Sequence, residues 1–354
     1  MKRILTLIAI PVLALGILSG CGKTAENAAP ADQPNQAQPA AGGGQKTDPN
    51  DPLSQFPPIK LPFTVENDAA VVEYQGGTLT GKEFTEFLQV ISFLNPPQRQ
   101  MIEAADQETL KTYAREYTAT KILASRADEA TRKQAETDST TSFEKVKGQY
   151  LSLLGKDEKN FDLLLQKQGL TKDQVIAQMS MINSSIGFLK KDIQDADLQK
   201  EYDGADKASF TTASVRHILI STDSRKPEEA LKLANDLIAR IKKGEDFAAL
   251  AKQYTDDPGS KESGGLYENA DVNQWVPEFK EAALKQPVGQ VGEPVKTDYG
   301  YHVMRVENRK VKTFAEAKEG LRQQALEKKY GEFVNVEMNK LVTKWNIPQP
   351  KPAA

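Results

Sequence analysis

The sequence predicts an α+β chain in which a compact unit of strands and helices is inserted into a mostly α-helical domain. Apolar residues recur at helical spacing from about residue 80 to residue 193. The pattern changes to β-like runs within residues 208–309 and returns to helical spacing after residue 310. This last apolar stripe is too long for the small unit to cover, so we expect it to pack on the first helical region.

Composition excludes several classes of protein. The 354 residues are enough for two or three domains. Charged residues make up 27% of the chain, but the formal net charge is only -3. The chain therefore lacks the excess of positive charge that would predict a nucleic-acid partner. The single cysteine, Cys21, excludes an internal disulfide and a cysteine-based metal site. We expect neither a metal nor a cofactor.

The first 20 residues are typical of a secretory signal. Lys2 and Arg3 precede an apolar run over residues 4–18, which is shorter than the ~20 residues of a membrane-spanning helix. The following Ser-Gly-Cys21 resembles the lipobox of bacterial lipoproteins, in which the cysteine receives a diacylglyceryl group. The alternative is an ordinary cleaved signal with an incidental cysteine.

Residues 21–61 are rich in Ala, Pro, Gln and Gly and nearly devoid of apolar side chains. Such a segment cannot bury enough surface to offset its conformational entropy, so it predicts a disordered tether. Residues 348–354 form a short proline-containing tail.

A helical, chaperone-like region is predicted over residues 62–207. Two short strands flank a Gly-Gly turn in residues 69–80, and capping boxes at Thr80 and Thr171 begin helices. Nothing in this region has the spacing of a catalytic or metal site. Its apolar stripes are interpreted as core, with a groove for substrate as the alternative.

The inserted unit, residues 208–309, has the predicted order β-α-α-α-β-β. A strand over residues 212–222 precedes a helix that begins at Pro227 and ends at Gly244, and a shorter helix follows. After an acidic loop and an irregular piece, a third helix begins at Pro277 and two strands close the unit. The only histidines of the chain, His217 and His302, fall in the first and last strands, which predicts that they meet.

A third capping box at Thr313 begins the C-terminal helix, residues 310–347. Its apolar face includes Leu326, Tyr330, Phe333, Val334, Met338, Leu341 and Trp345, and Pro348 ends the helix.

The inserted unit resembles the parvulin peptidyl-prolyl cis/trans isomerases, which have a small antiparallel sheet surrounded by helices. Six family motifs occur in the family's order: His217-Ile-Leu, Gly244-x-Asp-Phe-x-x-Leu-Ala251, Thr255-Asp-Asp257, Gly264-Gly265, Pro277-Glu-Phe279 and Thr297-Asp-Tyr-Gly-Tyr-His302. The whole layout resembles the PrsA-type foldase lipoproteins of Gram-positive bacteria. The resemblance implies a prolyl isomerase at the outer face of the cell membrane, lipid-anchored through Cys21, and suggests a homodimer.

The resemblance also implies roles for individual residues. His217 and His302 match the paired histidines of the family, where they are either architectural or chemical. Asp257 matches the position beside the reacting bond that holds Cys or Asp, although it could be only a turn residue before a proline. Thr297 matches the threonine that hydrogen-bonds within the histidine network.

The proline pocket is expected from Tyr267, Trp275 and Phe279. Trp275 and Phe279 match its apolar wall, with plain core as the alternative, and Tyr267 stands where leucine is usual. Ala270 also departs from the family, which often has an aromatic residue there. The basic cluster of phosphate-directed parvulins is absent after His217, so no phosphorylated substrate is required.

Prolyl isomerisation needs little from side chains. The barrier of roughly 18–20 kcal/mol arises from amide resonance, and a dry pocket with groups that favour the twisted amide can lower it. We therefore expect an extracytoplasmic foldase whose partners are unfolded or partly folded secreted proteins. The alternative is a non-enzymatic holdase lipoprotein with an inactive parvulin unit.

Overall fold

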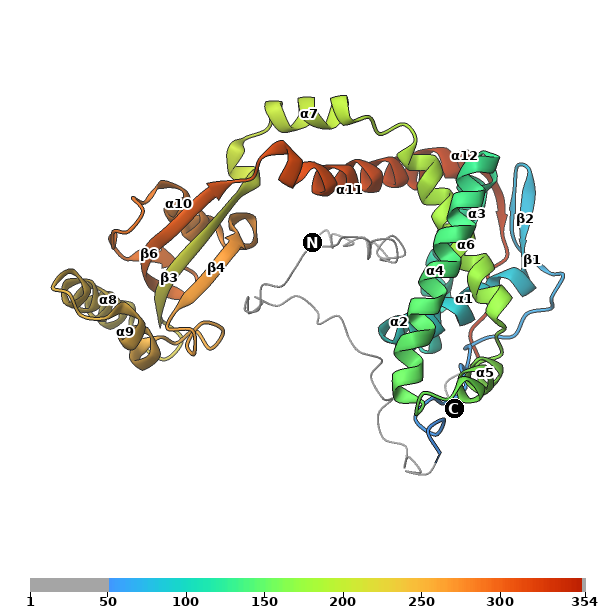
Figure 1. The fold of residues 1–354 in the computed structure, drawn as a ribbon, viewed down its shortest axis with the longest axis horizontal. Coiled ribbons are helices and arrows are strands. Elements are labelled where there is room, and N and C mark those ends of the chain that lie inside the picture. Colours follow the sequence, from blue (N-terminus) through green and yellow to red (C-terminus); the bar gives the residue numbers. More distant parts are fainter. Residues whose placement is uncertain (1–50, 352–354) are drawn as a thin grey trace. The chain divides into compact units, whose positions relative to one another are not determined.

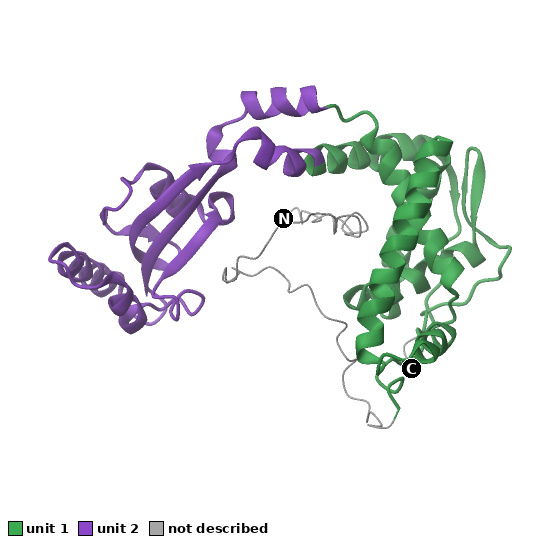
Figure 2. Ribbon diagram, viewed as in Figure 1, with its two compact units in different colours: residues 1–20, 35–194, 323–354 green, residues 21–34, 195–322 purple. Residues whose placement is uncertain are grey.

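The structure, a computed structural model, describes residues 51–351 in two compact units (Figure 2). Unit 1 comprises residues 51–194 and 323–351 of the described chain, and unit 2 comprises residues 195–322. The predicted signal, Cys21 and most of the predicted tether lie outside the described residues. No helix between residues 51 and 351 is both long and apolar enough to cross a membrane.

Unit 1 is built mainly from helices (Figure 1). They are α1 (Gly81–Leu94), α2 (Pro96–Glu103), α3 (Gln107–Ser125), α4 (Glu129–Leu153), α5 (Glu158–Lys167) and α6 (Lys172–Lys190). The capping boxes predicted at Thr80 and Thr171 are confirmed. Each threonine hydroxyl accepts the backbone amide three residues on, and the side chains of Glu83 and Gln174 accept the backbone amides of the threonines. Pro96 and Pro97 follow the end of α1 and occupy the first turn of α2, a position that proline suits because it needs no amide donor there.

A three-stranded antiparallel sheet completes unit 1. Strands β1 (Ala70–Tyr74), β2 (Gly77–Thr80) and β7 (Val342–Trp345) lie in the order β2-β1-β7. The expectation of a helix through Trp345 is wrong. The C-terminal chain passes through a π-helical turn, Phe333–Glu337, and α12 (Met338–Leu341), and then pairs with β1 as strand β7. The β-branched Val342 and Thr343 favour a strand, and pairing with β1 satisfies the backbone hydrogen-bonding groups of both strands.

The C-terminal segment contributes to the core of unit 1. Leu326, Phe333, Val334 and Met338 belong to one buried cluster with residues of β1, α1 and α3. A second cluster lies between α1, α4, α5 and α6. Leu53 and Phe56, which the sequence analysis assigned to the tether, pack against this second cluster, and Lys167 donates to the Leu53 carbonyl.

Unit 2 contains a four-stranded antiparallel sheet of order β4-β3-β6-β5. Its strands are β3 (Thr211–Ser221), β4 (Leu266–Asp271), β5 (Val295–Thr297) and β6 (Gly300–Val311). Its helices are α7 (Asp195–Gly204), α8 (Pro227–Lys242), α9 (Phe247–Tyr254), α10 (Pro277–Lys285) and the start of α11 (Phe314–Glu332). α7 and β4 were not predicted from the sequence.

The alternation of β3 and β6 assigns the two faces of this sheet. Ile218, Ile220 and Val303 pack with α8 and α9, whereas Val215 and Met304 pack with Phe279 of α10. His217 and His302 have the parity of Val215 and Met304, and both rings contact Phe279, so they lie on the α10 face.

Candidate functional site

The two histidines meet in the centre of the sheet, as predicted. Strand register pairs His217 with Met304 and Leu219 with His302, so the histidines are diagonal neighbours on adjacent strands. Their Nδ1 atoms lie 3.2 Å apart, and the two residues are 4% and 5% exposed. Because both rings are buried, every ring nitrogen needs a partner.

Asp257 and Thr297 supply these partners at the two ends of the pair. The Nε2 atom of His217 lies 3.0 Å from Oδ2 of Asp257, and Thr297 Oγ1 lies 2.9 Å from Nε2 of His302. If each ring carries one proton, Thr297 donates to His302, His302 donates to His217, and His217 donates to Asp257. The four predicted catalytic residues therefore form one continuous hydrogen-bonded network.

Backbone contacts fix the loop that carries Asp257 against the edge of β3. The Asp256 amide donates to the Leu219 carbonyl at 2.8 Å, and Thr255 Oγ1 accepts the Leu219 amide at 3.1 Å. The Asp256 carboxylate accepts the Ser221 amide at 2.9 Å and forms an ion pair with Arg225. Asp257 is thus carried by a segment that continues the sheet.

The second glycine of the Gly-Gly motif, Gly265, is required by the backbone at its position. Its φ is +82°, and a Cβ there would lie 2.1 Å from the His217 carbonyl oxygen. The Gly265 carbonyl accepts the His217 amide at 2.8 Å, and the Gly265 amide donates to the backbone carbonyl of Ser260 at 2.7 Å. Only glycine permits both the positive φ and this approach.

The site separates charged from neutral groups. Partial burial opposes ionisation of Asp257, but hydrogen bonds from His217, Ser260 and Tyr267 hold the pKa of its carboxyl well below the ordinary value. Burial and the neighbouring His217 lower the pKa of His302 to about 3. Near neutral pH the network therefore ends in a carboxylate at Asp257 and contains a neutral imidazole at His302.

Aromatic rings surround the histidines. The Phe279 ring is edge-on to His217 and His302, with centroid distances of 5.3 and 5.1 Å, and Trp275 is edge-on to Phe279 at 5.1 Å. Phe279 is buried and Trp275 is partly buried. The predicted pocket residues therefore adjoin the network, Trp275 through Phe279.

Ser260 is a site residue that the sequence analysis missed. It is fully buried, its hydroxyl donates to Asp257 Oδ2, and its Oγ lies 3.1 Å from His217 Nε2. A small hydroxyl residue three positions after Asp257 in an Asp-Pro-Gly-Ser turn is a weak signal, since serine is common in turns for local reasons.

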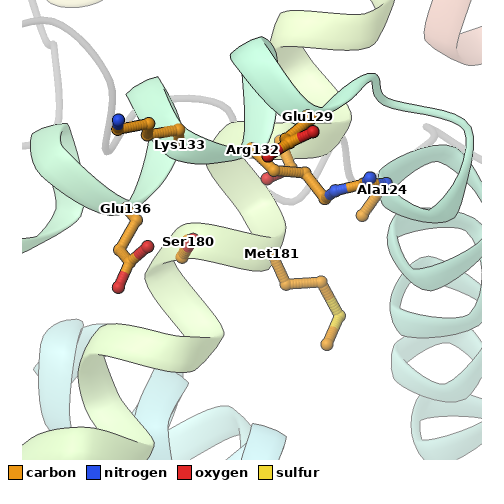
Figure 3. A pocket seen from close by; sticks show the side chains of 8 residues that line it. Ala124, Glu129, Arg132, Lys133, Glu136, Ser180 and Met181 are labelled. Carbon is orange, nitrogen blue, oxygen red and sulfur yellow. The ribbon is translucent and has the colours of Figure 1, made fainter.

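Unit 1 has a cleft of its own, of about 550 Å³. Figure 3 shows its lining side chains, which come from α3, α4 and α6. They are Ala124, Glu129, Arg132, Lys133, Glu136, Ser180, Met181 and Ser184. The wall from α4 carries charges of both signs, whereas α6 contributes a thioether and two hydroxyls. Within residues 51–351, no group of three or more His, Cys, Asp and Glu side chains is placed to hold a metal ion.

Residues 201–310 match the family of the PPIC-type PPIASE domain. The match contains the whole hydrogen-bonded network, so unit 2 carries a peptidyl-prolyl isomerase domain of the parvulin-like fold. The chain is also 35% identical over 209 residues to "Foldase protein PrsA 3" of Bacillus anthracis, covering 57% of this chain and 68% of that relative. The chain belongs to the PrsA foldase family.

The chain is also similar to a second foldase and to a solved structure. "Foldase protein PrsA" of Caldanaerobacter subterraneus subsp. tengcongensis is 37% identical over 175 residues, which are 49% of this chain and only 54% of that relative. A crystal structure of "Peptidylprolyl Isomerase (PrsA)" from Bacillus cereus has 25% identity and a TM-score of 0.37, covering 76% of this chain and 89% of that one.

Proposed function

We propose that the chain is a membrane-anchored extracytoplasmic foldase that catalyses cis/trans isomerisation of X-Pro bonds in unfolded or partly folded secreted proteins. One observation carries the proposal: the ionised Asp257 carboxylate is fixed by three side-chain donors beside a buried pair of histidines and the aromatic residues Phe279 and Trp275. Family membership supports it.

The proposed mechanism is electrostatic. Amide resonance places partial negative charge on the carbonyl oxygen and gives the C–N bond its double-bond character. A carboxylate next to that oxygen disfavours the resonance form and so favours the twisted amide, in which the bond is single. Asp257 supplies this charge, while Tyr267, Trp275 and Phe279 hold the pyrrolidine ring away from water.

The remaining network residues position Asp257. His217 donates to its carboxylate, His302 supports His217, and Thr297 supports His302. No covalent intermediate is required in this mechanism. The histidines are thus proposed as positioning residues.

The test is isomerisation of Ala-Pro peptides by the full chain. We expect acceleration over the uncatalysed reaction, which takes tens of seconds or more at 25 °C. Peptides with neutral, glutamate or phosphoserine residues before proline should differ by less than about tenfold, because Arg225, the first cation after β3, is already paired with Asp256. If the folded chain does not accelerate isomerisation, the proposed enzymatic function is wrong.

The cleft in unit 1 favours a second candidate function, a holdase that grips unfolded segments. Its mixture of apolar, hydroxyl and charged lining suits an extended peptide rather than one small ligand. Suppression of client aggregation by a chain that fails to isomerise peptides would leave this function in place of the first.

The anchor is proposed from the Leu-Ser-Gly-Cys21 sequence. In this proposal, a diacylglyceryl group in thioether linkage to Cys21 holds the mature chain at the outer face of the cell membrane. Cys21→Ala is expected to move most of the protein from the membrane fraction to the soluble fraction or the medium, measured by fractionation with a membrane-protein control. Unchanged membrane retention of this variant would contradict the lipid anchor.

A further inference from the structure

Tyr267 of β4 contacts two members of the network. Its hydroxyl donates to Asp257 Oδ2 at 2.8 Å, and its ring stacks on His217 with a centroid distance of 5.2 Å. Gly259 leaves room for this phenol, because a Cβ at Gly259 would lie only 3.2 Å from the Tyr267 hydroxyl oxygen. The register that pairs Tyr267 with Val215 directs the ring to the same face as His217.

We propose that Tyr267 is a positioning residue that holds the Asp257 carboxylate in its working orientation, in addition to lining the proline pocket. This inference rests on the proposed isomerase function and names one further determinant of the same site. Leucine, the usual family residue at this position, can line a pocket but cannot donate a hydrogen bond.

The distribution of donors explains how the orientation is set. Oδ2 of Asp257 accepts from Tyr267, from Ser260 and from the ring of His217. Among the described residues, Oδ1 accepts only the Gly259 amide, at 3.1 Å. Three donors on one oxygen fix the carboxylate plane and leave Oδ1 as the oxygen whose charge is least offset by hydrogen bonds, so Oδ1 is the oxygen assigned to act on the substrate carbonyl.

The electrostatics agree with this geometry. Burial and the Asp257 carboxylate raise the pKa of the Tyr267 phenol, so the phenol keeps the proton it donates. The other groups that face Asp257 are His217 and Ser260, with His302 behind His217. The adjacent Asp256 is neutralised by Arg225.

The test compares Tyr267→Phe with the wild type in the full chain. Phenylalanine keeps the stacked ring and removes only the donor. We expect kcat/KM for an Ala-Pro peptide to fall about tenfold at pH 7, mostly in kcat, and the acid limb of the pH profile to move to higher pH. Tyr202→Phe is the matched control, because Tyr202 also donates a phenol hydrogen bond in unit 2, to the Lys312 carbonyl, outside the site.

A second measurement separates this inference from the isomerase proposal. The Asp257 carboxyl is titrated by ¹³C NMR in wild type and Tyr267→Phe, whether or not the protein isomerises peptides. A higher carboxyl pKa in a variant that still unfolds cooperatively supports the positioning role, and linkage then predicts a modest fall in its melting temperature near neutral pH. The same titration curve and pH profile in both proteins would overturn the positioning role. A wild type that does not isomerise peptides, but whose Asp257 pKa still rises on Tyr267→Phe, would overturn only the proposed isomerase activity.

Discussion

Replacing Asp257 by asparagine is expected to lower kcat/KM for an Ala-Pro peptide by about a hundredfold. Asparagine retains the shape of the side chain and an oxygen that accepts from His217, but it removes the charge that disfavours amide resonance. Alanine at this position removes the acceptor as well and should reduce kcat/KM further. The measurement is a peptide isomerisation assay with the full chain.

The matched control is Asp236→Asn, which removes one exposed carboxylate from α8 in the same unit. It should leave kcat/KM within about twofold of the wild type. Because Asp257→Ala leaves Ser260 and Tyr267 without their acceptor, its melting temperature is measured in parallel. A folded Asp257→Asn variant with near wild-type kcat/KM would show that the charge does not act on the amide.

The parts of the fold that could be predicted from sequence are those with a local physical cause. A capping box satisfies orphan amides within four residues, so the starts of α1 and α6 could be identified at Thr80 and Thr171. The approach of His217 and His302 could be predicted because each lies in a strong β-like run of one small unit. The parvulin motifs added Asp257 and Thr297, which the structure joins to the same network.

The parts that were missed depend on distant residues. β4 has mostly exposed or half-buried side chains, and its pairing with β3 uses backbone groups that no sequence pattern marks. The charged helix α7 begins at Asp195, which pairs with Lys318 and Arg322 more than a hundred residues away. The interaction of Tyr267 with Asp257 likewise requires the register of β4 with β3, so its sequence position suggested only a pocket residue.

Acidification is expected to destabilise unit 2 between pH 6.5 and about 3 through His302. Burial and His217 hold its pKa at about 3 in the folded state, against 6.5 in the unfolded chain. Below pH 6.5 the unfolded state binds a proton that the folded state does not, so the free energy of unfolding falls as pH falls. This contribution is complete above pH 6.5, and about 2 kcal/mol of it is lost between pH 7 and pH 5.

Fluorescence can report this loss for unit 2 alone. The chain has two tryptophans, Trp275 in unit 2 and Trp345 in unit 1, so Trp345→Phe leaves a single reporter beside the site. Urea unfolding of this variant is measured at pH 7 and pH 5. The Asp257 carboxyl, whose pKa is lowered by folding, adds a loss only below its ordinary value of 3.8, outside this window.

The control is His302→Gln in the same background, which keeps a polar side chain between His217 and Thr297 but cannot titrate. Its unit 2 is expected to be less stable than wild type at pH 7, because glutamine does not reproduce both hydrogen bonds. Its free energy of unfolding should nevertheless lose about 2 kcal/mol less than the wild type between pH 7 and pH 5. Equal losses in the two proteins would place the acid sensitivity elsewhere, and His302 would then not be the neutral, buried centre of the network.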